Sequence, residues 1–129
     1  MTVGRSLPAT TDGAAIRKLS GPPRGDLSLA AVLAALSDPV RLEIVCTLAK
    51  GHERSCASLG LPIPKSTLTH HLRVLREAGV IVQRPVGTSR MTCLRRKDLD
   101  ARFPGLLDSV LTAARKRRGA GYTDRRHLL

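Results

Sequence analysis

Residues 65–82, KSTLTHHLRVLREAGVIV, carry the clearest structural pattern in this chain. Leu68, Leu72 and Leu75 recur at steps of four and three residues, which is the spacing of one face of an α-helix. Gly79 follows the last turn, and glycine is the common residue just past a helix end. The three β-branched residues after it favour a strand. The stretch therefore predicts a helix that leads directly into a strand.

The other face of this helix carries small polar and basic side chains instead of apolar ones. They are Lys65, Ser66, Thr69, His70 and Arg73. Such groups approach base edges and phosphates without burying an apolar residue. We therefore expect this face to bind nucleic acid.

A β-hairpin and a final helix are predicted after the strand. The hairpin has strands over 80–82 and 90–94, joined by a turn over 85–89. Apolar residues then recur at helical spacing over 99–111, although Pro104 and Gly105 are able to break this last element.

Two helices and a short segment are predicted upstream. Apolar residues at steps of three and four predict a helix over 29–36, and Asp38 caps a second helix with Pro39 at its first position. Ser55 caps a short segment, and Pro62 and Pro64 form a turn that excludes a continuous helix. The order helix, helix, short helix, turn, helix, hairpin, helix predicts a mainly α fold with a β-hairpin wing, the winged helix-turn-helix.

Length and composition fix the domain organisation. The chain has 129 residues, enough for one domain with tails. Residues 1–26 have the Gly, Pro, Ser and Thr content of a disordered N-terminal arm, and 113–129 form a basic C-terminal tail. A single folded domain, the winged helix-turn-helix, is expected over 27–112.

Positive charge is concentrated in one folded stretch. The formal net charge is +12, which indicates a polyanionic partner. Residues 64–97 contain eight Lys and Arg and one acid, Glu77, whereas 27–63 are neutral in sum and 98–113 are net acidic. A local basic patch is therefore expected around the predicted helix and hairpin.

Two motifs resemble the ArsR/SmtB family of bacterial repressors. They are LSDPVRLEI at 36–44 and STLTHHLRVLREAGVI at 66–81, and the resemblance covers roughly residues 27–112. It implies a homodimer paired through the first and last helices, with the helix from Lys65 in the major groove and the wings on flanking DNA. The implied function is a sequence-specific regulator of transcription, a repressor, bound to a pseudo-palindromic double-stranded operator.

The resemblance also implies which residues bind DNA. The candidates are Lys65, Ser66, Thr67, Thr69, His70, His71 and Arg73, with Arg84 and Arg90 flanking the wing. For His71, packing against the turn or holding one phosphate is favoured over reading a base.

No metal site and no cofactor are expected. Many relatives respond to metal ions, but here Cys56 stands alone in the third helix, and the last helix offers carboxylates without a histidine. Cys46, Cys56 and Cys93 are an odd number at wide spacing with no secretory leader ahead of them, which favours a reducing cytoplasm. Buried structural cysteines are the preferred interpretation, and a thiol redox-responsive regulator is an alternative.

Other function classes fit the sequence less well. An enzyme is not expected, because the chain has neither a phosphate-cradling Gly-rich loop nor an HExxH signature. Modules for single-stranded nucleic acid stack bases on aromatic side chains, and the basic patch has none. No apolar run is long enough to span a membrane. A winged-helix module that binds RNA or a protein partner stays an alternative.

Overall fold

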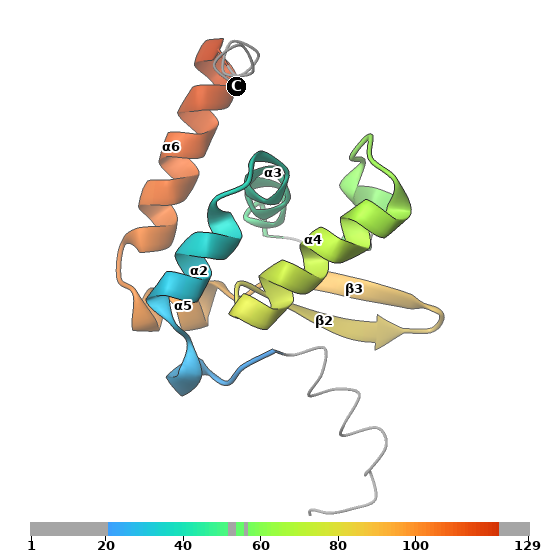
Figure 1. The fold of residues 1–129 in the computed structure, drawn as a ribbon, viewed down its shortest axis with the longest axis horizontal. Coiled ribbons are helices and arrows are strands. Elements are labelled where there is room, and N and C mark those ends of the chain that lie inside the picture. Colours follow the sequence, from blue (N-terminus) through green and yellow to red (C-terminus); the bar gives the residue numbers. More distant parts are fainter. Residues whose placement is uncertain (1–20, 52–53, 56, 122–129) are drawn as a thin grey trace, which may run out of the picture.

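Three helices and a small antiparallel sheet form the centre of the structure, a computed structural model that describes residues 21–51, 54–55 and 57–121 (Figure 1). In chain order the elements are η2 (Arg24–Asp26), α2 (Leu29–Leu36), α3 (Pro39–Leu48), β1 (Arg54–Ser55), η3 (Ala57–Leu59), α4 (Lys65–Ala78), β2 (Ile81–Val86), β3 (Ser89–Leu94), α5 (Arg96–Arg102) and α6 (Leu106–Gly121). This order confirms the predicted winged helix-turn-helix fold.

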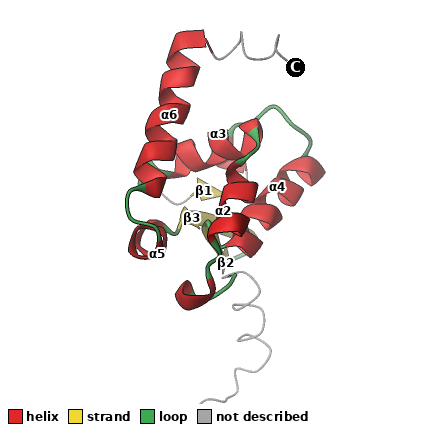
Figure 2. Ribbon diagram, turned by 60° about the vertical axis from the view of Figure 1, so that its left-hand side comes forward, coloured by secondary structure: helices red, strands yellow, loops and turns green. Residues whose placement is uncertain are grey.

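Helices α2 and α3 lie between α4 and α6 (Figures 1 and 2). The carboxylate of Asp38 caps α3 as predicted, since it accepts hydrogen bonds from the backbone N–H of Val40 at 2.9 Å and of Arg41 at 3.0 Å. Gly79 ends α4 with φ at 88°, and a Cβ there would collide with the side chain of Leu27. Only glycine fits both the backbone angle and the contact.

The leucine stripe of α4 lies at the centre of the core. Leu75 is fully buried and Leu72 is 2% exposed. Both belong to one apolar cluster that takes Ile44 from α3, Ile81 from β2 and Leu111 from α6. The position of α4 is therefore fixed by packing on helices and sheet together.

The hairpin is longer and its turn tighter than the sequence predicted. Strands β2 and β3 pair from Ile81 with Leu94 to Val86 with Ser89, so the predicted turn at 85–89 shrinks to Gly87 and Thr88. Pro85 lies in β2 because β2 is an edge strand, where the missing N–H costs no ladder hydrogen bond.

Strand β1 was not predicted. Arg54 and Ser55 pair with Thr92 and Met91 on the free edge of β3 and make the sheet three-stranded. The hydroxyl of Ser55 also accepts a hydrogen bond from the N–H of Ser58, as its predicted capping role requires. A strand of this length is too short to have an alternation pattern in the sequence.

The chain breaks between α5 and α6 at Pro104 and Gly105, as predicted. Helix α6 then continues past residue 112, where the C-terminal tail was expected to begin, and Ala114 is buried in the core. The arm predicted over 1–26 likewise ends in an ordered segment, since the carbonyl of Pro22 accepts a 2.6 Å hydrogen bond from Arg95. Residues 1–20 and 122–129 lie outside the described part.

An ion pair fastens the end of the N-terminal segment to α5. The Arg24 guanidinium donates to Asp98 at 2.7 Å, and Arg95 donates to the other carboxylate oxygen at 2.9 Å. The hydrogen bond from Arg24, followed by that from Arg95, lowers the pKa of Asp98.

None of the helices in the described ranges is long and apolar enough to cross a membrane.

Candidate nucleic-acid interface

Helix α4 presents separate stripes of side chains, because successive residues of an α-helix turn by about 100°. We call Ser66, His70, Arg73 and Glu77 the outer stripe, which lies opposite Leu68 and Leu75 and is exposed throughout. We call Lys65, Thr69, Leu72 and Arg76 the wing stripe, which faces the space between α4 and the hairpin. The predicted DNA-binding residues of α4 are thus distributed over more than one face.

The outer stripe is a polar surface without an apolar side chain. Arg73 is exposed and makes no hydrogen bond or ion pair with any residue in the described part. The ring of His70 is exposed and lies 5.6 Å from the ring of His71, centroid to centroid. A basic group, a hydroxyl and an imidazole are therefore available together to a partner outside the molecule.

His71 faces the start of α3. Its Nδ1 lies 3.1 Å from a guanidinium nitrogen of Arg41 and 4.0 Å from the carboxylate of Asp38, and its side chain is only 12% exposed. Arg41 also donates to the carbonyl of Ala35 at 2.6 Å. The contacts of His71 therefore position α4 on the preceding helices. Thr67 precedes His71 by one helical turn and is exposed.

The two arginines of the wing lie on opposite faces of the hairpin. Arg84 pairs with Met91 and Pro85 pairs with Arg90, and neighbouring residues of a strand point to opposite sides. Arg90 thus shares its face with Gln83, while Arg84 is exposed on the other face. The sequence placed both arginines at the wing but left their faces undetermined.

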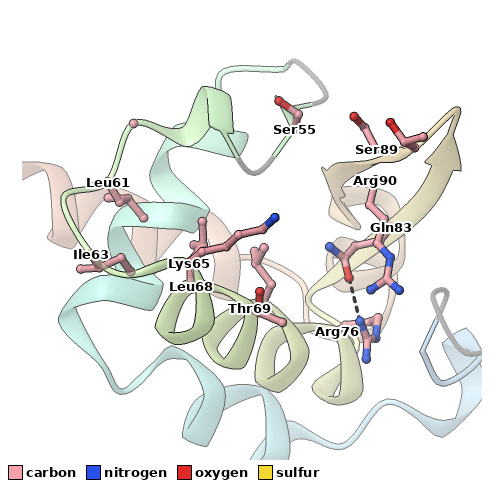
Figure 3. Close-up of a pocket in the computed structure, with 13 residues that line it drawn as sticks. Ser55, Leu61, Ile63, Lys65, Leu68, Thr69, Arg76, Gln83, Ser89 and Arg90 are labelled. Atoms are coloured by element: carbon pink, nitrogen blue, oxygen red, sulfur yellow. Dashed lines mark hydrogen bonds between the residues drawn. The ribbon is translucent and has the colours of Figure 1, made fainter.

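A buried polar chain connects α4 to the hairpin (Figure 3). The Arg76 guanidinium donates to the side-chain oxygen of Gln83 at 2.7 Å, and the Gln83 amide donates to the hydroxyl of Thr92 at 3.2 Å. These side chains are 6%, 4% and 0% exposed. Burial lowers the pKa of Arg76, and the nearby charge of Arg90 lowers it further. This chain sets the position of the wing relative to α4.

The sequence did not reveal these hydrogen bonds, because Arg76 was counted among the surface charges. Two local signals were present. Arg76 follows Leu72 by one helical turn, and Gln83 alternates with the buried Ile81 along the strand. Neither signal identifies the partner, since the contact joins two elements.

The basic patch is smaller than the charge count suggested. Arg95 pairs with Asp98 at 2.9 Å and Arg96 pairs with Asp108 at 3.0 Å, so acids of the following segment neutralise them. Arg76 is buried. Of the eight cations in residues 64–97, the exposed ones are Lys65, Arg73, Arg84, Arg90 and Lys97.

The cysteines and acids do not gather into a ligand set in the described ranges, where no group of three His, Cys, Asp or Glu could hold a metal ion. Cys46 is 2% exposed, and the half-buried Cys93 thiol lies 3.6 Å from the carbonyl oxygen of Leu94 as a donor. Cys56 lies outside the described residues. The redox alternative stays a hypothesis.

A helix-turn-helix with an exposed polar stripe, followed by a hairpin packed on the same helix, defines a winged helix-turn-helix regulator of transcription. The family described as "Helix-turn-helix domain" matches residues 36–84. The chain is 36% identical over 84 residues to the uncharacterized HTH-type transcriptional regulator YceK of Bacillus subtilis (strain 168), covering 63% of this chain and 84% of that protein. It belongs to the ArsR-type family of these regulators.

One solved structure supports this assignment. An ArsR-like transcriptional regulator from Rhodococcus sp. RHA1 is 29% identical with a TM-score of 0.51, over 78% of this chain and 86% of that one. The transcriptional repressor BigR from Xylella fastidiosa is 36% identical with a TM-score of 0.49, over 58% of this chain and 85% of that one. The family consists of transcriptional regulators and not of enzymes.

Proposed function

We propose that this protein binds double-stranded DNA in a sequence-specific way, with the outer stripe of α4 in the major groove. The observation that carries the proposal is the exposure of Ser66, His70 and Arg73 on the face opposite the buried leucines. A major groove admits an α-helix, and each base pair presents a distinct pattern of donors and acceptors there. Hydroxyl, imidazole and guanidinium groups match those patterns.

The hairpin supplies contacts to the DNA backbone beside the recognition helix. Arg84 and Arg90 are both exposed and stand on different faces of the hairpin. Lys65 and Thr69 border the hairpin from the side of α4 and add backbone contacts there. Contacts of this kind fix the register of the protein on the duplex and carry no sequence information themselves.

We further propose that the protein acts as a homodimer and as a repressor. A two-fold dimer fits a pseudo-palindromic operator whose half-sites lie about one helical turn, roughly 10 base pairs, apart or a small multiple of it. A dimer bound across such a site occupies the duplex that polymerase needs. The domain that does this comprises residues 27–112 together with the continuation of α6.

The direct test compares a double-stranded operator with single-stranded DNA and RNA at two salt concentrations. The operator is first selected from random duplexes by the purified protein. The duplex should bind more tightly than either single strand, and its affinity should fall steeply with salt because phosphate neutralisation releases counterions. Equal binding to RNA, or no retention of any duplex, would contradict the proposal and leave RNA or a protein as the partner.

Exposed leucines of α2 predict where the dimer forms. Leu29 is 48% exposed and Leu33 is 45% exposed, one helical turn apart on the same face. Replacing Leu33 by Ser should raise the dimer dissociation constant by about tenfold or more, because the apolar area that a partner would cover is lost. Sedimentation velocity over a concentration series measures this constant.

Val86 provides the matched control for the dimer. It is 44% exposed at the hairpin tip, away from α2. Val86→Ser should leave the dissociation constant unchanged. The proposed dimer interface is wrong if Leu33→Ser and Val86→Ser have the same dimer dissociation constant. It is also wrong if the wild-type protein sediments as a monomer at every concentration.

A further inference from the structure

A groove of about 640 Å³ lies between the start of α4 and the hairpin (Figure 3). We call it the wing groove. Its α4 side is the wing stripe, its hairpin side carries Gln83, Ser89 and Arg90, and Ser55 of β1 stands at its upper edge. Lys65, Arg76 and Arg90 line it, and no carboxylate is among its described lining residues.

One of these cations is incompletely satisfied. The Arg76 side chain is more than nine-tenths buried, and its Nε has no hydrogen-bond partner in the described part of the chain. Within the described residues its only hydrogen bond goes to the neutral side-chain oxygen of Gln83, and the charge of Arg90 is close enough to oppose its own. A buried charge is costly unless it is paired, so this guanidinium lacks an anion.

The rest of the wing groove is apolar. Leu68 and Leu72 of α4 form its floor, and the half-buried Leu61 and Ile63 of the preceding turn extend it. Thr69, Ser55 and Ser89 add hydroxyl groups to the lining of the groove. The lining therefore offers an anion site next to a hydrophobic surface, the arrangement of a small-molecule pocket.

We propose that the wing groove binds a small organic anion, one carboxylate or phosphate group on an apolar body, and that this ligand weakens DNA binding. The anionic group lies on Arg76 and Arg90, and the apolar body covers Leu68, Leu72 and Ile63. The occupied groove removes Arg90 and Lys65 from the DNA backbone, so the regulatory half of the inference rests on the proposed function. A DNA phosphodiester would use the cations but leave the apolar floor without a partner.

The test follows the side-chain amide of Gln83 by NMR while the full chain, free of DNA, is titrated with four probes. These are hexanoate, acetate, hexan-1-ol and inorganic phosphate. Hexanoate should shift the Gln83 amide in a saturable way and bind at least about tenfold more tightly than acetate, since each buried methylene adds to affinity. Hexan-1-ol, which has no charge, should bind at least about tenfold more weakly than hexanoate.

Two pairs of variants locate the site. Arg76→Met should weaken hexanoate binding by about tenfold or more, whereas Arg73→Met on the outer stripe should not change it. Should Arg76→Met disturb the fold, Arg90→Gln tests the same site from an exposed position, and Arg84→Gln on the opposite face of the hairpin is its control. The proposal is overturned if Arg90→Gln binds hexanoate as the wild type does, or if hexan-1-ol binds equally well.

A second readout separates this inference from DNA binding itself. Hexanoate at saturating concentration should weaken duplex binding by about tenfold while acetate at the same ionic strength should not, which excludes simple screening. If inorganic phosphate and a short duplex both shift the Gln83 amide while hexanoate does not, the groove is a phosphodiester site and the inference fails. If no duplex binds at all, the proposed function fails, yet the titration of the free protein still decides the anion site.

Discussion

The combined variant Ser66→Ala, His70→Ala, Arg73→Ala is expected to lose sequence preference and to bind the selected operator about two to six orders of magnitude more weakly. The three side chains share the exposed outer stripe of α4. Each well-placed base contact is worth roughly 1 to 3 kcal/mol of discrimination, and contacts at separate base pairs add approximately. Competition of labelled operator with random duplex at fixed salt measures both affinity and preference.

The same variant should fold like the wild-type protein, because truncating exposed side chains usually changes stability by less than about 0.5 kcal/mol. Lys97→Ala is the matched control, since it also removes one exposed cation, from α5 and outside the outer stripe. That control should retain the sequence preference. If the combined variant still prefers the operator, the outer stripe is not the base-reading surface.

Truncation of Leu75 to Ala is expected to destabilise the protein by about 2 to 5 kcal/mol. Leu75 is fully buried in the cluster that joins α4 to the neighbouring helices and the sheet, so its loss leaves a cavity among several elements. Typical domains have about 5 to 15 kcal/mol of stability in total, so the change is a large share. Urea unfolding followed by circular dichroism, at one fixed protein concentration, measures the difference.

Val86→Ala serves as the comparison for Leu75→Ala, because Val86 is 44% exposed at the hairpin tip. It should cost less than about 1 kcal/mol. Loss of DNA binding by Leu75→Ala should be recovered at lower temperature, where more of the chain is folded. Equal destabilisation by the two variants would refute the central role of the leucine stripe.

Features that depend on neighbouring residues were predictable. The cap formed by Asp38 and Pro39, the end of α4 at Gly79 and the break at Pro104 and Gly105 were all found where the sequence placed them. Each depends on backbone angles and hydrogen bonds within a few residues. The exposure of Ser66, His70 and Arg73 follows in the same way, because a leucine stripe fixes which face of a helix points outward.

Features that join distant segments were not predictable. Strand β1 exists because β3 offers it an edge, and Asp108, which pairs with Arg96, comes from α6, which follows the break after α5. The structure also has packed residues on both sides of 27–112 for the same reason. Arg24 bonds to Asp98 of α5, and Ala114 is buried in the core. A count of charges along the sequence does not show which of them form ion pairs in the folded protein.

The fold, the orientation of α4 and the polar character of its outer stripe follow from the amino-acid order alone, because helical period, caps and turns are local physical constraints. Three features emerge only when the elements pack together: Arg76 is buried with Gln83 and Thr92, Arg84 and Arg90 lie on opposite faces of the hairpin, and a cationic groove separates α4 from the wing. These depend on strand register and on the distance between packed elements, which no single segment of the chain specifies.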